Sequence, residues 1–181
     1  MTVTALPLEG LFTLDPLRHG DARGWFAETF RDDLFRARVA DVGFVQENMS
    51  LSRRPGTLRG LHFQTPPRAQ GKLVSCVAGA LWDVAVDLRP GPGFGRWHAE
   101  VLSAENGRRF WIPAGFAHGF CTLEPDTVIA YRCTDTYAPA QDGGIAWDSA
   151  GVDWPGIADP ATLSDKDRAL PPLDAARGVF A

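Results

Sequence analysis

Hydrophobic and polar residues alternate along most of this chain with a period of two. Within residues 81–88, one set of alternate positions holds Trp82, Val84, Val86 and Leu88, and the other holds Leu81, Asp83, Ala85 and Asp87. Such alternation is typical of a β-strand with both faces in use. Only residues 31–40 show a helical pattern, with aspartates early, where they favour the helix dipole. The pattern predicts an all-β protein with short peripheral helices.

Turn residues separate the predicted strands. Gly79 lies between 72–78 and 80–88, Asn106-Gly107 between 97–103 and 108–112, and Glu124-Pro125-Asp126 between 115–123 and 127–134. We predict a hairpin at each of these turns, and the Asn-Gly pair is the strongest signal because both of its positions need positive φ. Short strands at regular spacing are typical of a sandwich or barrel, and a jelly roll is one closed form that hides most strand edges.

The chain is expected to form a single domain, residues 1–181. Its 181 residues suit one domain and are enough to bury a full hydrophobic core. The strands of the barrel are expected over about residues 45–137. From about residue 138 to residue 181 the sequence is rich in Pro, Gly and Asp, and we expect it to wrap the barrel as loops with short helical turns.

Composition narrows the class of protein. The formal net charge is −4 and the 18 basic residues form no run of five, which argues against a general nucleic-acid binder. No apolar run approaches the roughly 20 residues of a membrane span, and the N-terminus lacks signal-peptide features. The three cysteines form no CxxC pair and are interpreted as buried residues in a reducing compartment. We expect a cytoplasmic protein that binds neither nucleic acid nor membranes.

The densest run of candidate catalytic residues is 58–64, followed by Lys72. His62 is the leading candidate for a general base, because the unperturbed pKa of histidine lies near neutral pH. Alternation places His62 on one face with Leu58, Gly60 and Gln64, and Gly60 leaves room for a ligand. Arg59 has the opposite parity, so it reaches the same pocket only if the strand bulges or ends near Gly60. The alternative is a core histidine bonded to a carbonyl.

Other segments offer an acid and partners for histidine. His118 is flanked by small or apolar residues, so it needs a partner if buried, and Asp83 is a candidate from a strand of the same sheet system. Tyr131 can exchange a proton, and Asp167, in the segment 163–167, can orient an imidazole. The alternatives are a structural His–Asp pair, a core tyrosine and a solvated turn capped by Ser164.

Several polar and aromatic residues suit a nucleotide. Arg23 and Arg59 can fork onto phosphate oxygens. Phe26 or Tyr137 can stack on a nucleotide base. Glu28, Gln46 and Asn48 can form hydrogen bonds with the polar edge of the base. Gln46 and Asn48 alternate with Ser50, so these three residues share one strand face. Ordinary surface polar residues and core aromatics are the alternative.

A metal site is not expected. The chain has 4 histidines and contains neither His-x-His nor His-x-x-x-His. A catalytic transition-metal site usually takes about three protein ligands. The two best histidines supply two, so a carboxylate would have to be the third.

These segments, in this order, resemble the dTDP-4-dehydrorhamnose 3,5-epimerase family. The resemblance runs from about residue 8 to about residue 172. It is carried by Asp21-Ala22-Arg23-Gly24 with Phe26 and Glu28, by Gln46-x-Asn48-x-Ser50, and by the segments 58–72, 83–89, 112–120, 131–134, 137–139 and 163–167. Each motif is weak alone, but eight in order are specific.

The resemblance implies a cupin-type jelly roll without metal ligands or cofactor. It implies a homodimer in which N-terminal strands, about residues 1–30, cross to the partner. The implied reaction inverts C3 and C5 of dTDP-4-dehydro-6-deoxy-D-glucose, through an enolate, to give dTDP-4-dehydro-L-rhamnose. In the implied mechanism, His62 with Asp167 is the base, Tyr131 is the acid and Lys72 lies beside the ketone, while His118 and Asp83 form a supporting pair. The resemblance assigns substrate binding to Arg59, Gln46, Asn48, Tyr137 and Lys166. It also implies that three residues reach the partner's site: Arg23, Phe26 and Glu28.

The sequence departs from the family pattern at two loops. Pro92-Gly93 stands where the family usually has Ser and Thr, and the loop Ser149-Ala150-Gly151 is shorter. Neither departure touches the proposed base, acid or lysine, but both can reshape loops that choose the substrate. A C3-only epimerase, a metal-dependent cupin isomerase or oxygenase, and a catalytically silent sugar-nucleotide binder are the alternatives.

Overall fold

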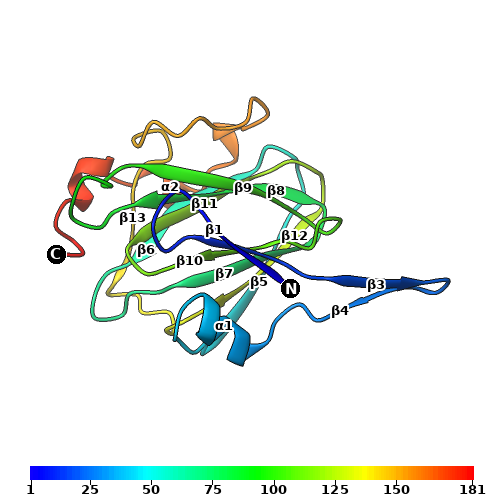
Figure 1. Cartoon of the computed structure of the whole chain (residues 1–181). Coiled ribbons are helices and arrows are strands. Elements are labelled where there is room, and N and C mark those ends of the chain that lie inside the picture. The colour runs from blue at the N-terminus through cyan, green and yellow to red at the C-terminus, as the bar shows by residue number, and fades with distance from the viewer.

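Two antiparallel β-sheets face each other in the computed structural model, which describes residues 1–181 (Figure 1). The six-stranded sheet has the order β1 (Thr2–Ala5), β2 (Phe12–Asp15), β10 (Arg109–Ile112), β7 (Lys72–Ala78), β12 (Thr127–Cys133), β5 (Gln46–Ser52). The five-stranded sheet has the order β13 (Asp142–Gly144), β6 (Leu58–Gln64), β11 (Phe116–Thr122), β8 (Ala80–Asp87), β9 (Trp97–Ser103). The all-β jelly-roll prediction is confirmed.

The remaining elements are short. A two-stranded hairpin joins β3 (Arg18–Asp21) and β4 (Gly24–Ala27). Helix α1 (Asp32–Arg38) follows it, close to the predicted 31–40, and the last third of the chain holds η1 (Pro160–Thr162), α2 (Asp165–Arg168) and η2 (Leu173–Ala176). No helix is long and apolar enough to cross a membrane.

Strand β8 uses both of its faces, as its alternation predicts. Leu81 and Ala85 point into the core between the two sheets. Val84 and Val86 lie in a second buried cluster on the opposite face, which the C-terminal segment covers with side chains such as Phe180. Asp83 is fully buried on the inner face. Because an isolated buried carboxylate is costly, this position requires a partner.

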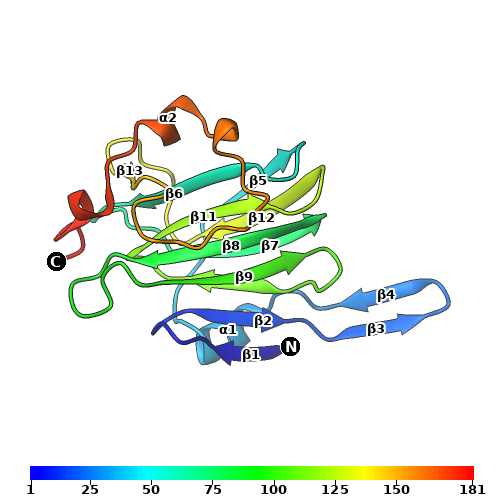
Figure 2. The ribbon, with the colours of Figure 1, turned by 90° about the horizontal axis from the view of Figure 1, so that it is seen from above.

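A different segment of the chain packs on the outer face of each sheet (Figures 1 and 2). Helix α1 packs Phe35 against Leu73 and Trp111 of the six-stranded sheet, with the two aromatic ring centroids 5.1 Å apart. The C-terminal segment, orange and red in Figure 1, lies on the other side of the molecule and covers the five-stranded sheet. This arrangement brings α2 beside β6.

The three predicted hairpins at Gly79, Asn106-Gly107 and Glu124-Pro125-Asp126 are wrong. Each of these turns carries the chain from one sheet to the other: β7 to β8, β9 to β10, and β11 to β12 are not paired strands. Gly107 takes a positive φ but Asn106 does not, so the expected two-residue turn is absent. A turn signal marks a reversal of the chain, but long-range burial decides which strand pairs with which.

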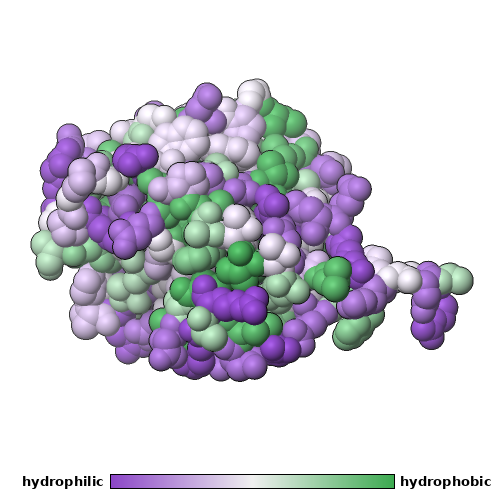
Figure 3. Space-filling view, viewed as in Figure 1, coloured by the Kyte–Doolittle hydropathy of each residue, from purple (hydrophilic) through white to green (hydrophobic).

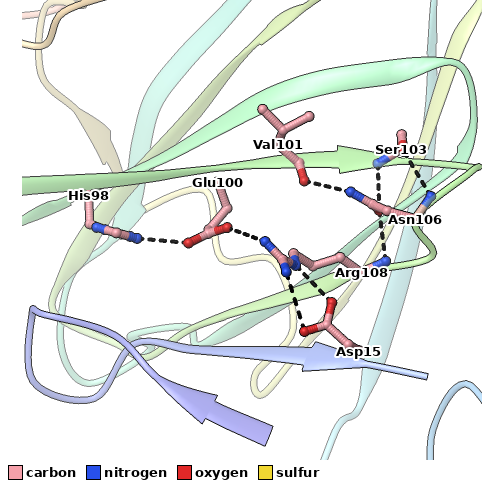
Figure 4. Close-up of polar contacts among 7 residues, drawn as sticks. All are labelled: Asp15, His98, Glu100, Val101, Ser103, Asn106 and Arg108. Carbon is pink, nitrogen blue, oxygen red and sulfur yellow. Dashed lines mark hydrogen bonds and ion pairs between the residues drawn. The ribbon is translucent and has the colours of Figure 1, made fainter. Parts of the chain in front are cut away.

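Side chains stabilise the crossing from β9 to β10 (Figure 4). Asn106 binds the backbone of Ser103, Val101 and Arg108, which fixes a wider turn. Arg108 then donates to Glu100 of β9 and to Asp15 of β2, each at 2.8 Å. These ion pairs tie the two sheets together at the edge opposite β5 and β13.

We expect Arg108→Met to lower the free energy of unfolding by about 1–3 kcal/mol, because it leaves two partly buried carboxylates without their cation. Glu100 is 14% exposed in this ion pair. Thermal and urea unfolding measure the effect. The matched control is Arg53→Met, which breaks a pair whose side chains are 79% and 65% exposed and costs about 0.5 kcal/mol or less. Equal losses in the two variants would contradict this role of the network.

The β3–β4 hairpin stands out from the body of the molecule (Figures 2 and 3). Its two strands pair only with each other. By contrast β1 and β2, which fall in the predicted exchanging segment 1–30, complete the chain's own six-stranded sheet through β10. The barrel therefore includes strands well before residue 45, and only residues 18–27 form a projecting arm.

Candidate active site

A polar cavity opens between the two sheets. Its volume is about 490 Å³, and its lining residues are Gln46, Asn48, Met49, His62, Phe63, Gln64, Gln70, Lys72, Tyr131, Tyr137, Asp142 and Lys166. A second cavity of about 240 Å³ shares His62, Lys72 and Tyr131 with it and adds Ser50, Arg59 and His118. The proposed base, acid and lysine therefore line both cavities, although they come from three different strands.

His62 on β6 is paired with Asp167 on α2. The distance between His62 Nε2 and Asp167 Oδ1 is 2.6 Å, and Asp167 is almost fully buried. Burial alone would raise the pKa of Asp167, but the hydrogen bond and charge of His62, with the Ser164 hydroxyl, hold it below its usual value. When a carboxylate accepts a hydrogen bond from the Nε2–H group of a neutral imidazole, the Nδ1 atom is left free to accept a proton. An imidazole held in this way can act as an oriented base.

A bulge in β6 brings Arg59 and His62 to the same cavity. The pairing register between β6 and β11 shifts at Gly60: His62 lies opposite His118, but Arg59 lies opposite Phe120. Arg59 and His62 can therefore line one pocket, because the strand bulges near Gly60 as their opposite parity requires. The same shift corrects the predicted face of Leu58, which packs in a separate cluster instead of beside His62.

Gly60 is needed for this bulge. Its φ is +120°, and a Cβ there would lie 2.6 Å from the Cα of Gly119. Gly91 has a similar φ of +128° but nothing within 4 Å.

We expect Gly60→Ala to cost about 2 kcal/mol more stability than Gly91→Ala, because only the first adds a backbone clash to the strained φ. Urea unfolding of the two variants measures the difference, and loss of activity should accompany only Gly60→Ala. Similar stabilities would show that the close approach of β6 and β11 relaxes freely.

His118 and Asp83 form a second pair inside the five-stranded sheet. His118 Nε2 lies 2.5 Å from Asp83 Oδ1, and both side chains are buried. Burial lowers the pKa of His118, against the opposing pull of Asp83. The other carboxylate oxygen, Asp83 Oδ2, has no hydrogen-bond partner although it is buried. The predicted pairing of these two residues is confirmed.

Lys72 and Tyr131 come from neighbouring strands of the six-stranded sheet. Burial lowers the pKa of Lys72. Its Nζ makes one hydrogen bond, to the backbone carbonyl oxygen of His62 at 3.5 Å. Burial raises the pKa of Tyr131, so its hydroxyl keeps its proton at neutral pH. A lysine with few partners can bind a developing oxyanion, and a neutral phenol can donate a proton.

A chain of hydrogen bonds follows the mouth of the larger cavity. Gln46 donates to Asn48 at 3.1 Å and accepts from the backbone N–H of Tyr137 at 2.8 Å. The Tyr137 hydroxyl donates to Asp142, which also accepts from Lys166. The cavity therefore brings together four residues that the family resemblance implies for substrate binding: Gln46, Asn48, Tyr137 and Lys166.

Three predicted binding residues do not reach this chain's own cavity. Arg23 and Phe26 lie on the projecting hairpin, and Glu28 follows it directly. Phe26 is 71% exposed, and Arg23 pairs only with its neighbour Asp21. Their place on an arm leaves them free to reach another molecule.

Five residues that line the larger cavity were not among the predicted site residues: Met49, Phe63, Gln64, Gln70 and Asp142. Gln64 and Gln70 hold the loop beyond β12 through the carbonyls of Thr136 and Asp135. Asp142 precedes two glycines in a polar stretch, which carries no signal of a site. Only the pairing of β13 with β6 places it at the cavity. No group of three or more His, Cys, Asp or Glu side chains is arranged to hold a metal ion.

The fold and the cavity together define the class of protein. In a jelly roll of two sheets, one sheet carries His62, which is paired with Asp167 of α2, and the other carries Tyr131 and the buried Lys72. This chain is a cupin-type enzyme equipped to move protons on a bound ligand.

Comparison with known proteins identifies the family. Residues 5–175 match the family model described as dTDP-4-dehydrorhamnose 3,5-epimerase. Relatives of that name from Sinorhizobium fredii and Methanothermobacter thermautotrophicus are 51% and 46% identical, covering 96% and 92% of this chain and 90% and 91% of their own. The structure of dTDP-6-deoxy-D-glucose-3,5-epimerase from Legionella pneumophila in complex with dTDP-4-keto-L-rhamnose is 41% identical, with a TM-score of 0.89, and covers 96% of this chain and 93% of that one. The chain belongs to the dTDP-4-dehydrorhamnose 3,5-epimerase family.

Proposed function

We propose that this enzyme inverts C3 and C5 of dTDP-4-dehydro-6-deoxy-D-glucose to give dTDP-4-dehydro-L-rhamnose. The family and the names of its close relatives support this activity. The observation that carries the mechanism is the placement of His62 and Tyr131. They lie on β6 and β12, which belong to opposite sheets, and both line the same cavity. A sugar ring between them has a base on one face and an acid on the other.

The proposed steps follow from this placement. The C4 ketone makes the hydrogens on C3 and C5 acidic, and the free Nδ1 of His62 removes one of them. The electron pair moves onto the ketone oxygen, where the ammonium of Lys72 stabilises the enolate. Tyr131 then gives its proton to the same carbon from the opposite face, which inverts it. His118 and Asp83 support the site from β11 and β8.

The nucleotide is assigned to the mouth of the cavity. Gln46 and Asn48 present polar groups suited to a pyrimidine edge, and Tyr137, which is 57% exposed, offers a ring for stacking. Arg59 and Lys166 supply positive charge for the diphosphate. This division puts the sugar deep in the cavity, beside His62.

A homodimer is proposed to complete the site. The β3–β4 arm exposes Trp25 and Phe26, by 57% and 71%, which is costly for a monomer in water. Arg23, Phe26 and Glu28 are assigned to the partner's cavity, as the family resemblance implies. We place the dimer in the cytoplasm, where its three buried thiols stay reduced.

Proton NMR in deuterated water tests the reaction. Incubation with dTDP-4-dehydro-6-deoxy-D-glucose and chelator is expected to introduce deuterium at C3 and C5 with inversion at both. Deuterium and inversion at C3 alone would move the assignment to a C3-only epimerase. Activity that is lost with chelator and restored by a defined metal would favour a metal-dependent cupin, and nucleotide binding without exchange would favour a silent binder.

Tyr131→Phe is expected to separate proton removal from inversion. The base and lysine stay in place, so deuterium still enters the substrate, but the inverted product forms at least about 100-fold more slowly because the acid is missing. The same NMR experiment measures both rates. Inversion at the wild-type rate would remove Tyr131 as the acid.

A further inference from the structure

One carboxylate oxygen holds two of the proposed binding groups at the mouth of the cavity. Asp142 Oδ2 accepts a hydrogen bond from the Tyr137 hydroxyl at 3.0 Å and another from the ammonium of Lys166. All three side chains line the larger cavity. The carboxylate raises the pKa of both Lys166 and Tyr137, so the lysine is a cation and the tyrosine is neutral.

Asp142 is the more buried member of this group and lies on a paired strand, whereas Lys166 is the more exposed member. Asp142 opens β13, where it is paired with Gln64 of β6, and its side chain is 16% exposed. Lys166 is 54% exposed on the four-residue helix α2. A lysine ammonium on a flexible stem can change partners at little cost, whereas a carboxylate on a paired strand cannot.

The charges at the mouth create a competition. A diphosphate that enters the cavity brings negative charge close to the Asp142 carboxylate, which repels it. Lys166 is the cation within reach of both anions, and an exposed ion pair is weak enough to be exchanged for another. A ligand without a diphosphate offers Lys166 no better partner.

We propose that Asp142 is a positioning residue that holds Lys166 and Tyr137 at the mouth of the cavity before the ligand binds and releases Lys166 to the diphosphate of the incoming sugar nucleotide. The inference rests on the proposed function, since it takes a dTDP-linked sugar as the ligand. It makes Asp142 a determinant of specificity: the pair with Lys166 opens for a diphosphate and stays closed for a nucleoside or a free sugar.

Calorimetric titration of dTDP and of thymidine into the full-length protein tests this role. Asp142→Asn keeps an acceptor for Tyr137 but removes the charge that holds Lys166. We expect it to bind dTDP about threefold to fivefold more tightly, the range of one exposed ion pair, and thymidine unchanged. In the Lys166→Met background the gain in dTDP affinity is expected to shrink to the part that comes from lost repulsion by Asp142, because the rest of the effect passes through Lys166. In steady state, KM should fall without a rise in kcat.

Asp165→Asn is the matched control. Asp165 is adjacent to Lys166 on α2, is fully exposed and pairs with Arg168. Its replacement by asparagine removes the same charge but leaves the ion pair between Asp142 and Lys166 intact. The dTDP affinity of this variant should equal that of the wild type. Asp142→Ser, with the near-UV circular dichroism of every variant, guards against a folding defect of the asparagine variant.

The outcomes separate the two levels of the proposal. Unchanged or weaker dTDP binding by Asp142→Asn would overturn the inference. Equal tightening of thymidine, persistence of the full effect without Lys166, or the same effect from Asp165→Asn would also overturn it. Absence of dTDP binding by the wild-type protein would overturn the proposed function and this inference with it. Normal wild-type binding with an unaffected Asp142→Asn variant would overturn the inference alone.

Discussion

Replacing His62 by alanine is expected to abolish deuterium exchange at C3 and C5 and to reduce kcat by about 10²–10⁴-fold. The reason is geometric. The imidazole is held at Nε2 by Asp167, at 2.6 Å. The other basic group that the five-stranded sheet contributes to the larger cavity, Asp142, is occupied by Tyr137 and Lys166. Asp167→Asn keeps the ring but removes the carboxylate that orients it, so a smaller loss is expected. Stopped-flow assays and proton NMR in deuterated water measure both losses.

The control for this prediction is another histidine. His98 lies in the Glu100–Arg108 network at the opposite edge of the sandwich (Figure 4), outside the cavity. His98→Ala should leave kcat unchanged at a temperature where the variant is folded. The His62→Ala variant should still bind dTDP, because the mouth residues are intact. Full activity in His62→Ala would show that another group removes the proton.

Replacing Lys72 by methionine is expected to reduce kcat by about 10²–10³-fold with little change in KM. The ammonium stabilises charge that develops only when the proton leaves, so its loss weakens the transition state more than the bound substrate. Methionine fills a similar volume, which preserves packing between β7 and β12. Steady-state kinetics separate kcat from KM, and a loss confined to KM would place Lys72 in binding alone.

The pH profile tests the charge of Lys72 directly. Burial lowers its pKa from the ordinary value of 10.5, so the ammonium is lost, and kcat/KM falls, at a pH below 10.5. Lys72→Arg keeps a cation at all accessible pH, and the alkaline limb should move upward. It should then follow Tyr131, whose pKa burial raises above the ordinary 10.0. An unchanged alkaline limb in Lys72→Arg would assign that limb to another group.

The sequence determined the local structure and the chemistry of the cavity. Alternation located the strands nearly to the residue, as in β7 and β9, because the faces of a strand are set by the side chains themselves. Whether a side chain can act as an acid, a base or a cation depends on its residue type. The residue types and the order of the motifs were therefore enough to name four candidates: His62, Lys72, Tyr131 and Asp167. Local parity set only a condition, that the strand must bulge or end near Gly60 if Arg59 and His62 share a pocket, and the structure meets it with a bulge.

Only the tertiary structure decided which elements meet. Gly79 and Asn106 signal a reversal of direction, but both faces of these strands are apolar enough to be buried, and the chain buries them by changing sheets instead of pairing neighbours. Asp142 and Lys166 are 24 positions apart, and their contact depends on β13 joining β6 and on α2 docking beside it. Residue type and spacing are local quantities, whereas sheet choice is settled by the summed burial of the whole chain.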